Sequence, residues 1–160
     1  MDYHVPYEIE RKFLVKNAHL PDLDKGVQIS QGYLYAGTEK TIRLRIKEQQ
    51  GFITIKGPSD KGARPEFEYA IPFMDAQFML ENYCREGRIE KIRREIAWAG
   101  KTWEIDEFLG ENNGLWIAEV ELLTQDEDVE LPPWIGAEVT GDNRYHNSSL
   151  SVHPYTHWEL

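Results

Sequence analysis

Cysteine is nearly missing from this chain of 160 residues, and the single copy, Cys84, excludes an intramolecular disulfide. A protein without disulfides fits a reducing compartment, so we expect a cytoplasmic location. The sequence also lacks any run of about 20 apolar residues that would span a membrane. Residues 1–6 carry neither a basic region nor an apolar core, which argues against a signal peptide.

Positive charge is scarce as well. Lys and Arg number 18 against 28 Asp and Glu, so the net charge is −10. This excess of negative charge disfavours binding to nucleic acid or to an anionic membrane surface. Internal repeats, low-complexity tracts and linkers are also missing, so we expect one domain over residues 1–160, with its core at about 7–151.

What the chain has in abundance is strand-like runs of β-branched and aromatic residues. Eight such runs, each bounded by glycine, proline or asparagine turn signals, predict eight β-strands. Tight connections at 49–51 and 99–101 predict antiparallel neighbours. The predicted strands are Tyr7–Val15, Val27–Tyr35, Thr41–Glu48, Phe52–Lys56, Pro65–Ile71, Arg88–Trp98, Thr102–Phe108 and Leu115–Leu123.

Two helices complete the predicted secondary structure. The first begins with Asp75 as N-cap, uses Phe78, Met79 and Tyr83 as apolar positions, and ends at Gly87. The second spans residues 143–151, and the tail from 152 to 160 looks irregular, with no function that we can assign. In this second helix, Tyr145 and Leu150 are expected to face inward. We interpret Cys84 as a structural thiol. The tryptophans are interpreted as core residues under the helices, and the histidines as surface or packing residues: Trp98, Trp103, Trp116 and Trp134, and His4, His19, His146, His153 and His157.

Charged side chains alternate with apolar ones along the predicted strands. In the segment Glu8-Ile9-Glu10-Arg11-Lys12, successive side chains point to opposite faces, so Glu8, Glu10 and Lys12 share one face. The same alternation recurs in later strands, where the two members of each charged pair have the same sign. The acidic pairs are Glu66/Glu68 and Glu119/Glu121, the basic pairs are Arg43/Arg45 and Lys91/Arg93, and Glu104/Asp106 follows the pattern in part.

Two architectures accommodate such strands. An open sheet would pack its apolar face on the helices and expose its charged face to water. Alternatively, the sheet closes into a barrel whose charged face lines a tunnel. Because a solvated face would mix both signs evenly, the segregation by strand favours the tunnel. We therefore predict a mainly β (α+β) fold, an eight-stranded antiparallel β-barrel with a charged interior and helices packed outside.

The charges predict what this tunnel holds. Six basic side chains exceed the needs of one phosphate and match a ligand with several phosphoryl groups. They are Lys12, Arg43, Arg45, Lys56, Lys91 and Arg93. The carboxylates would repel such a ligand unless a divalent cation bridged them. Mg²⁺ and Mn²⁺ take carboxylate, water and phosphate oxygens together. The residues thus predict a metal-dependent polyphosphate site, where positioning and charge neutralisation promote phosphoryl transfer to water.

Taken together, these segments resemble the CYTH superfamily, the triphosphate tunnel metalloenzymes. Glu8-Ile9-Glu10-Arg11-Lys12 is similar to the family's ExExK signature, and the supporting segments follow in the family's order. They are Gln31-Gly32-Tyr33-Leu34, Arg43-Leu44-Arg45, Thr54-Ile55-Lys56-Gly57, Glu66-x-Glu68, Glu90-Lys91-Ile92-Arg93, Ala118-Glu119-Val120-Glu121 and Arg144-Tyr145-x-Asn147-x-x-Leu150. The resemblance, to short single-domain bacterial members, covers residues 7–151.

The resemblance implies hydrolysis of inorganic triphosphate to diphosphate and phosphate with Mg²⁺ or Mn²⁺. It implies metal ligands at Glu8, Glu10, Glu119 and Glu121, and phosphate contacts at Lys12, Arg43, Arg45, Lys56, Lys91 and Arg93. Supporting roles, orienting the basic residues or a water, are expected for Glu66, Glu68, Glu104 and Asp106.

Lys12 and Tyr33 are the candidate catalytic residues. A tyrosine facing the tunnel would hydrogen-bond the attacking water or a phosphate oxygen. The alternative is a tyrosine packed under the outer helices, because the phase of its strand is ambiguous.

Other functions stay open at this point. Adenylate cyclase and hydrolysis of nucleoside or thiamine triphosphates need the same metal and phosphate contacts. A non-catalytic polyphosphate-binding module is a further alternative. A homodimer is possible.

Overall fold

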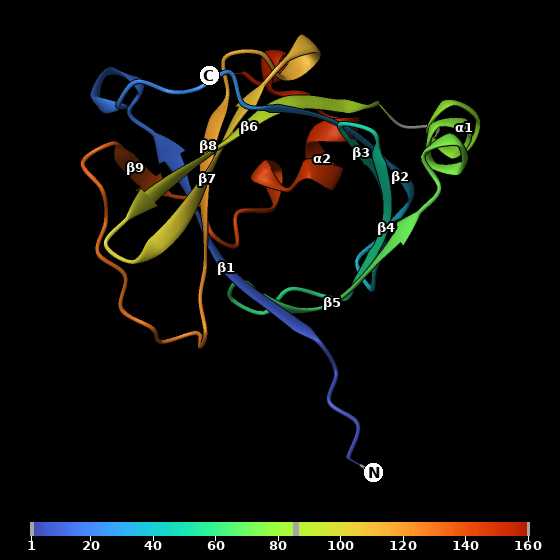
Figure 1. The fold of residues 1–160 in the computed structure, drawn as a ribbon, viewed down its shortest axis with the longest axis horizontal. Coiled ribbons are helices and arrows are strands. Elements are labelled where there is room, and N and C mark those ends of the chain that lie inside the picture. The colour runs from blue at the N-terminus through green and yellow to red at the C-terminus, as the bar shows by residue number, and fades with distance from the viewer. Residues whose placement is uncertain (1, 85–86, 160) are drawn as a thin grey trace.

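Eight antiparallel strands close into a ring in the computed structural model, which describes residues 2–84 and 87–159 (Figure 1). Neighbours follow the order β5-β4-β3-β2-β6-β7-β8-β1, and β1 pairs back onto β5. A further strand, β9, pairs with β1. The strands are β1 (Tyr7–Val15), β2 (Val27–Ala36), β3 (Thr41–Lys47), β4 (Gln50–Lys56), β5 (Ala63–Ile71), β6 (Ile89–Trp98), β7 (Lys101–Phe108), β8 (Trp116–Glu121) and β9 (Ile135–Glu138). The predicted eight-stranded barrel is confirmed, with β9 as an addition.

The outward side of β1, β7 and β8 carries one of two apolar clusters. Phe13 is 5.7 Å from Trp103 between ring centroids, and Trp103 is 5.6 Å from Trp134. All three side chains are buried, together with Leu122 and Ile135. The long loop after β8 and the strand β9 therefore cover this part of the barrel, where we had expected helices.

Helix α1 (Phe73–Tyr83) lies outside the ring against β3 and β4, as Figure 1 shows. It begins after Pro72, three residues earlier than predicted, because the proline ring presets the backbone there. Ala76 and Leu80 are its buried residues. Of the predicted apolar positions, Met79 is half-buried, whereas Phe78 and Tyr83 are exposed. The predicted end of this helix includes residues 85 and 86, which lie outside the described residues.

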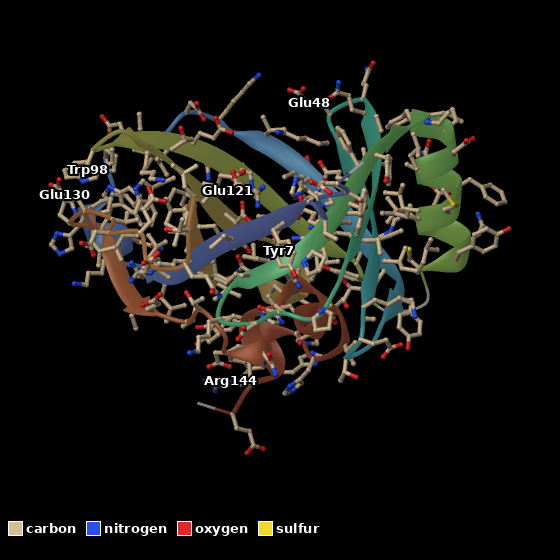
Figure 2. All side chains as sticks on the ribbon, turned by 90° about the horizontal axis from the view of Figure 1, so that it is seen from below. Tyr7, Glu48, Trp98, Glu121, Glu130 and Arg144 are labelled. Carbon is tan, nitrogen blue, oxygen red and sulfur yellow. The ribbon has the colours of Figure 1, made fainter. Side chains whose placement is uncertain are left out.

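Helix α2 (Asn147–Val152), preceded by a 3₁₀ turn at Asn143–Tyr145, lies within the outline of the ring in Figure 1, and Figure 2 shows this segment at one end of the barrel. Phe108 stands opposite Lys91 in the register of β6 and β7, so both side chains point inward. A second apolar cluster forms there, with Ile89, Phe108, Leu115, Ile117, Val139, Tyr145 and Leu150. The expectation that both helices pack outside thus holds for α1 alone.

This position of α2 has a local cause. Towards one end of the barrel, the inward residues of β6, β7 and β8 change from charged to apolar. On β6, Ile89 lies beyond Lys91 at this end. On β7 and β8, Phe108 and Ile117 take the corresponding places. The end of the barrel therefore offers an apolar surface. Tyr145 and Leu150, predicted to face inward, are buried against it.

Within the part of the chain that the structure describes, every helix is too short or too polar to cross a membrane.

Candidate active site

A small chamber lies inside the barrel, with a volume of about 40 Å³. Side chains from seven strands, from the turn before α2 and from the first residues of α2 line it. They bring together all six predicted phosphate-binding residues, two of the predicted metal ligands and both candidate catalytic residues. The lining residues are Glu10, Lys12, Tyr33, Thr41, Arg43, Arg45, Lys56, Arg64, Lys91, Arg93, Glu119, His146, Asn147 and Ser148.

Ion pairs hold most of the basic groups of this chamber. Lys56 Nζ lies 2.8 Å from Glu8 Oε2 and 3.1 Å from Glu66 Oε2. Lys12 Nζ lies 3.6 Å from Glu119 Oε1. Although burial alone would raise the pKa of Glu8, the Lys56 ammonium lowers it to about 2. Glu8 is therefore a carboxylate at neutral pH.

A second ion-pair network surrounds Asp106. Its carboxylate accepts two hydrogen bonds from Arg93, at 2.7 and 2.8 Å, and lies 2.8 Å from Lys91 Nζ. Lys91 and Asp106 are each 1% exposed, so this pair is isolated from water. Burial lowers the pKa of Lys91 to about 7, although Asp106 opposes that shift. Glu104 adds a contact of 2.7 Å to Arg93.

The acidic residues for which we expected supporting roles all contact bases or their neighbours. Glu66 contacts Lys56, and both Glu104 and Asp106 contact Arg93. On β5, the remaining member, Glu68, accepts a hydrogen bond from Thr54 at 2.9 Å and lies 3.4 Å from an Arg43 nitrogen.

Two arginines keep unused hydrogen-bonding capacity. Arg45 donates from Nε to Gln31 Oε1 at 2.8 Å, and it forms no ion pair with the residues that the structure describes. Burial, with Arg43 and Arg93 nearby, lowers its pKa to about 9. The buried Nε of Arg43 also has no hydrogen-bond partner among the described residues. Since a buried cation without a counter-ion is costly, this corner of the chamber suits an anion.

Glu10 is the opposite case, a carboxyl group without a cation of its own. Burial, then the charges of Glu119 and Glu8, raise its pKa to about 8. No ion pair of Glu10 is found within the described residues. Three carboxyl groups close enough to influence one another need a bridging cation when all are ionised.

These donors fit a divalent metal by their chemistry, since carboxylate oxygens are the ligands that Mg²⁺ and Mn²⁺ prefer. In residues 2–84 and 87–159, however, no three His, Cys, Asp or Glu side chains are already gathered around one point. Glu8 and Glu119 are turned towards lysines instead. Glu121 is exposed and stands opposite Glu10 in the register of β1 and β8 (Figure 2). A metal would therefore have to draw these side chains together.

Tyr33 points into the chamber. It is 7% exposed, lines the chamber, and stands opposite Arg43 in the register of β2 and β3. The alternative of a tyrosine packed under the outer helices is thereby excluded. The candidate catalytic partner, Lys12, lines the same chamber and donates to the carbonyl of Tyr145 at 3.5 Å.

Sequence reasoning missed several chamber residues. Arg64 lies one residue before the predicted strand, and the alternation Arg64-x-Glu66 would have revealed it. His146, which we interpreted as a surface or packing residue, is half-buried at the chamber wall. Burial and then Lys12 lower its pKa to about 4. Asn147 accepts hydrogen bonds from Gln31 at 2.8 Å and Lys91 at 2.9 Å.

The other structural interpretations are largely upheld. Trp103 and Trp134 are buried, and Trp98 and Trp116 are half-buried against the same cluster. Cys84 is half-buried, and burial raises the pKa of its thiol.

Residues 6–154 match the CYTH domain family, to which this chain therefore belongs. The chain is 45% identical over 152 residues to an inorganic triphosphatase of Acetivibrio thermocellus, which covers 95% of this chain and 97% of the relative. It is 39% identical to an inorganic triphosphatase of Nitrosomonas europaea, covering 91% and 97%. A crystal structure of an inorganic triphosphatase has a TM-score of 0.66 at 34% identity, again covering 91% and 97%.

The family that the sequence motifs indicated is thus confirmed. Membership of this family of metalloenzymes implies a divalent metal ion, for which the carboxylates of the chamber are the available ligands.

Proposed function

We propose that this protein is a metal-dependent inorganic triphosphatase, which hydrolyses triphosphate to diphosphate and phosphate inside the barrel. The observation that carries the proposal is the chamber itself. Cations from five strands converge there, two arginines have hydrogen-bonding capacity left over, and a carboxyl group that forms no ion pair with the described residues faces the same space. The two relatives named inorganic triphosphatases support the same substrate.

In this proposal the basic side chains bind and orient the phosphoryl groups. Arg43 and Arg45 supply donors that are unpaired in the described residues, while Lys56 and Lys12 become available when Glu8 and Glu119 turn to the metal. Lys91 and Arg93 stay paired with Asp106 and bind phosphate through their remaining donors. Most of the acceleration then comes from positioning and charge neutralisation, as phosphoryl transfer requires little covalent help.

Glu8, Glu10 and Glu119, with Glu121 at the rim, would hold Mg²⁺ or Mn²⁺. When bound, that ion neutralises phosphoryl charge and acts as a Lewis acid. The acidic partners Glu66, Glu68, Glu104 and Asp106 would keep the basic side chains in position.

Lys12 and Tyr33 would hold protons beside the reacting phosphoryl group. The Lys12 ammonium donates to an oxygen that gains charge, and the Tyr33 hydroxyl hydrogen-bonds the attacking water or a phosphate oxygen. Both atoms belong to side chains that line the chamber.

The alternatives require more than the chamber offers. Adenylate cyclase activity, or hydrolysis of nucleoside or thiamine triphosphates, needs space for an organic group. The chamber lining is rich in lysine and arginine, and Tyr33 is its one Phe, Tyr or Trp residue in the described chain, which favours a substrate made of phosphoryl groups alone. A polyphosphate-binding module without activity would leave the carboxylate set unused.

Phosphate release decides among these functions. We would measure it from inorganic triphosphate and from ATP, each with Mg²⁺, Mn²⁺ and EDTA. Chelator-sensitive release that favours triphosphate is the expected result. Activity on ATP alone, or cyclic AMP as product, would contradict the proposal. Absence of any product, together with tight polyphosphate binding, would support the binding module.

Two substitutions test the assigned residues. Lys12→Ala and Glu119→Ala are each expected to lower kcat by at least about 100-fold, because they remove a proton-holding group and a metal ligand. Circular dichroism should show that both variants keep the fold. Normal turnover in either folded variant would refute its assignment.

A further inference from the structure

Two larger cavities adjoin the barrel interior. The first, about 630 Å³, lies between the β2–β3 turn, the β4–β5 loop and α2, and we call it the α2-side cavity. The second, about 500 Å³, lies between the loop before β2, the β3–β4 turn and β6, and we call it the β6-side cavity. Figure 2 shows Glu48, of the β3–β4 turn, and Arg144, just before α2, at opposite sides of the molecule. The chamber therefore has one candidate opening on each side.

The chamber adjoins the α2-side cavity more closely. Four residues line both spaces: Thr41, Arg64, His146 and Ser148. Arg93 is the one residue that the chamber shares with the β6-side cavity in the described chain.

The nature of the barrier differs as well. Arg93 is tied at 2.7 Å to both Glu104 and Asp106, so ion pairs close the β6 side. On the α2 side, the shared residues are two hydroxyl side chains, a half-buried histidine and an arginine whose contact to Glu8 is longer, at 3.5 Å.

The two cavities also differ in their carboxylates, since acidic residues stand among the four basic residues of the β6-side lining, Lys25, Lys47, Arg93 and Arg94. In the described residues, no Asp or Glu lines the α2-side cavity, whereas Asp24, Glu48 and Glu95 line the β6-side cavity. Lys40 contributes an exposed ammonium to the α2 side, although Glu39 lies 3.4 Å from it outside the lining. For a chain with a net charge of −10, a lining free of carboxylates is an uncommon place where an anion is not repelled.

From these observations we propose that triphosphate reaches the chamber through the α2-side cavity, between Arg64, His146 and the hydroxyls of Thr41 and Ser148. This inference rests on the proposed triphosphatase function and adds the route of access. The cavity acts as an electrostatic funnel, and the four shared residues form the passage to the phosphate-binding arginines.

Lys40 and Lys25 make a matched pair for the test. Both lysines are exposed, and each lines one of the two cavities. In a Cys84→Ala background, we would prepare Lys40→Cys and Lys25→Cys, which change the net charge equally. Each thiol is then modified with methanethiosulfonate reagents that carry an ammonium, a sulfonate or a bulky neutral group. Hydrolysis of triphosphate is measured before modification, after it, and after reversal by a reductant.

At position 40, we expect the bulky group to lower kcat/KM about tenfold, and the sulfonate to lower it several-fold relative to the ammonium. The charge effect should shrink at about 0.5 M salt, and the reductant should restore activity. At position 25, every label should leave kcat/KM within about twofold.

The outcomes are distinguishable. If the unmodified variants hydrolyse no triphosphate, the proposed function fails. If they do, and the labels act at position 25 alone, at both positions equally or at neither, the route through the α2-side cavity is overturned.

Discussion

At the scale of single residues, Glu10 is the group whose ionisation is least compatible with the metal-free fold. Its pKa is raised to about 8, chiefly by burial and then by Glu119 and Glu8. A carboxyl group whose pKa is higher in the folded than in the unfolded state binds more protons when folded. The contribution of Glu10 to the free energy of unfolding is therefore fully present below pH about 4.5 and is lost as the pH rises through about 8.

We therefore expect Glu10→Gln to stabilise the metal-free protein at pH 8 to 9, by the order of 2–4 kcal/mol, and to change little near pH 4.5. The measurement is thermal or urea unfolding in EDTA across this pH range. A saturating divalent cation should reduce the gain, because the wild type then has its counter-ion. An equal stability of both proteins at pH 9 in EDTA would refute this assignment.

The ion pair of Asp106 leads to a second prediction at this scale. Asp106→Leu leaves Lys91 and Arg93 buried without their carboxylate, which should cost about 3–5 kcal/mol of unfolding free energy. Chemical denaturation measures this loss.

The matched control is Glu104→Gln, which removes a 35% exposed partner of the same arginine and should cost less than about 1 kcal/mol. A double variant, Asp106→Leu with Lys91→Met, should recover part of the loss. Similar costs for both single variants would contradict a buried network centred on Asp106.

At the scale of elements, the pairing of β1 with β5 is the weakest part of the ring. The register includes three residue pairs there, from Tyr7 with Pro65 to Ile9 with Ala63, whereas β2 and β3 pair along seven positions. Backbone hydrogen bonds from Glu10 to Gly62 and from Glu66 to Pro6 extend this seam by only two bonds. The ion pairs of Glu8 with Lys56 and Arg64 lie across it.

This seam should open more readily than the rest of the barrel. We expect the amide protons of Glu10 and Glu66 to exchange at least about tenfold faster than those in the middle of β2 and β3, as measured by hydrogen exchange in EDTA. Mg²⁺ with a non-hydrolysable imido analogue of triphosphate should slow this exchange. Equal protection of both regions in EDTA would argue against a weak seam.

At the scale of the whole molecule, the barrel interior neutralises itself. A chamber of about 40 Å³ has room for only a few water molecules, and most of its cations and carboxylates are bound to one another. Triphosphate and metal can enter only by separating these pairs. The metal draws carboxylates such as Glu8 and Glu119 away from the lysines, which frees the lysines for triphosphate. Triphosphate in turn draws the lysines away and frees the carboxylates for the metal. Each ligand should therefore favour binding of the other.

We expect Mg²⁺ to raise the affinity for the imido analogue at least about tenfold, and the analogue to raise the affinity for Mg²⁺ by the same factor. Isothermal titration calorimetry in both orders of addition checks the two factors. Ca²⁺, a larger ion, is a useful comparison for the demands of the site. Independent binding of metal and analogue would contradict an interior that neutralises itself.

Much of the site is readable from the sequence because strand periodicity is local. Once Glu8 and Lys12 are placed in one strand, their common face follows from the alternation, as it does for Arg43 with Arg45. The same reasoning could have reached Arg64. It could not reach His146 or Asn147, because these residues lie on a turn and a short helix whose position depends on distant strands.

The sequence alone determined the strands, the face on which each charge lies, and the family, since all three depend on the order of neighbouring residues. The tertiary structure alone decided which charges meet, that Arg45 and Glu10 stay without counter-ions in the described chain, and that α2 fills one end of the barrel. The reason is physical: alternation is set within a strand, whereas pairing and burial depend on the closure of the ring and on the segment that packs into it.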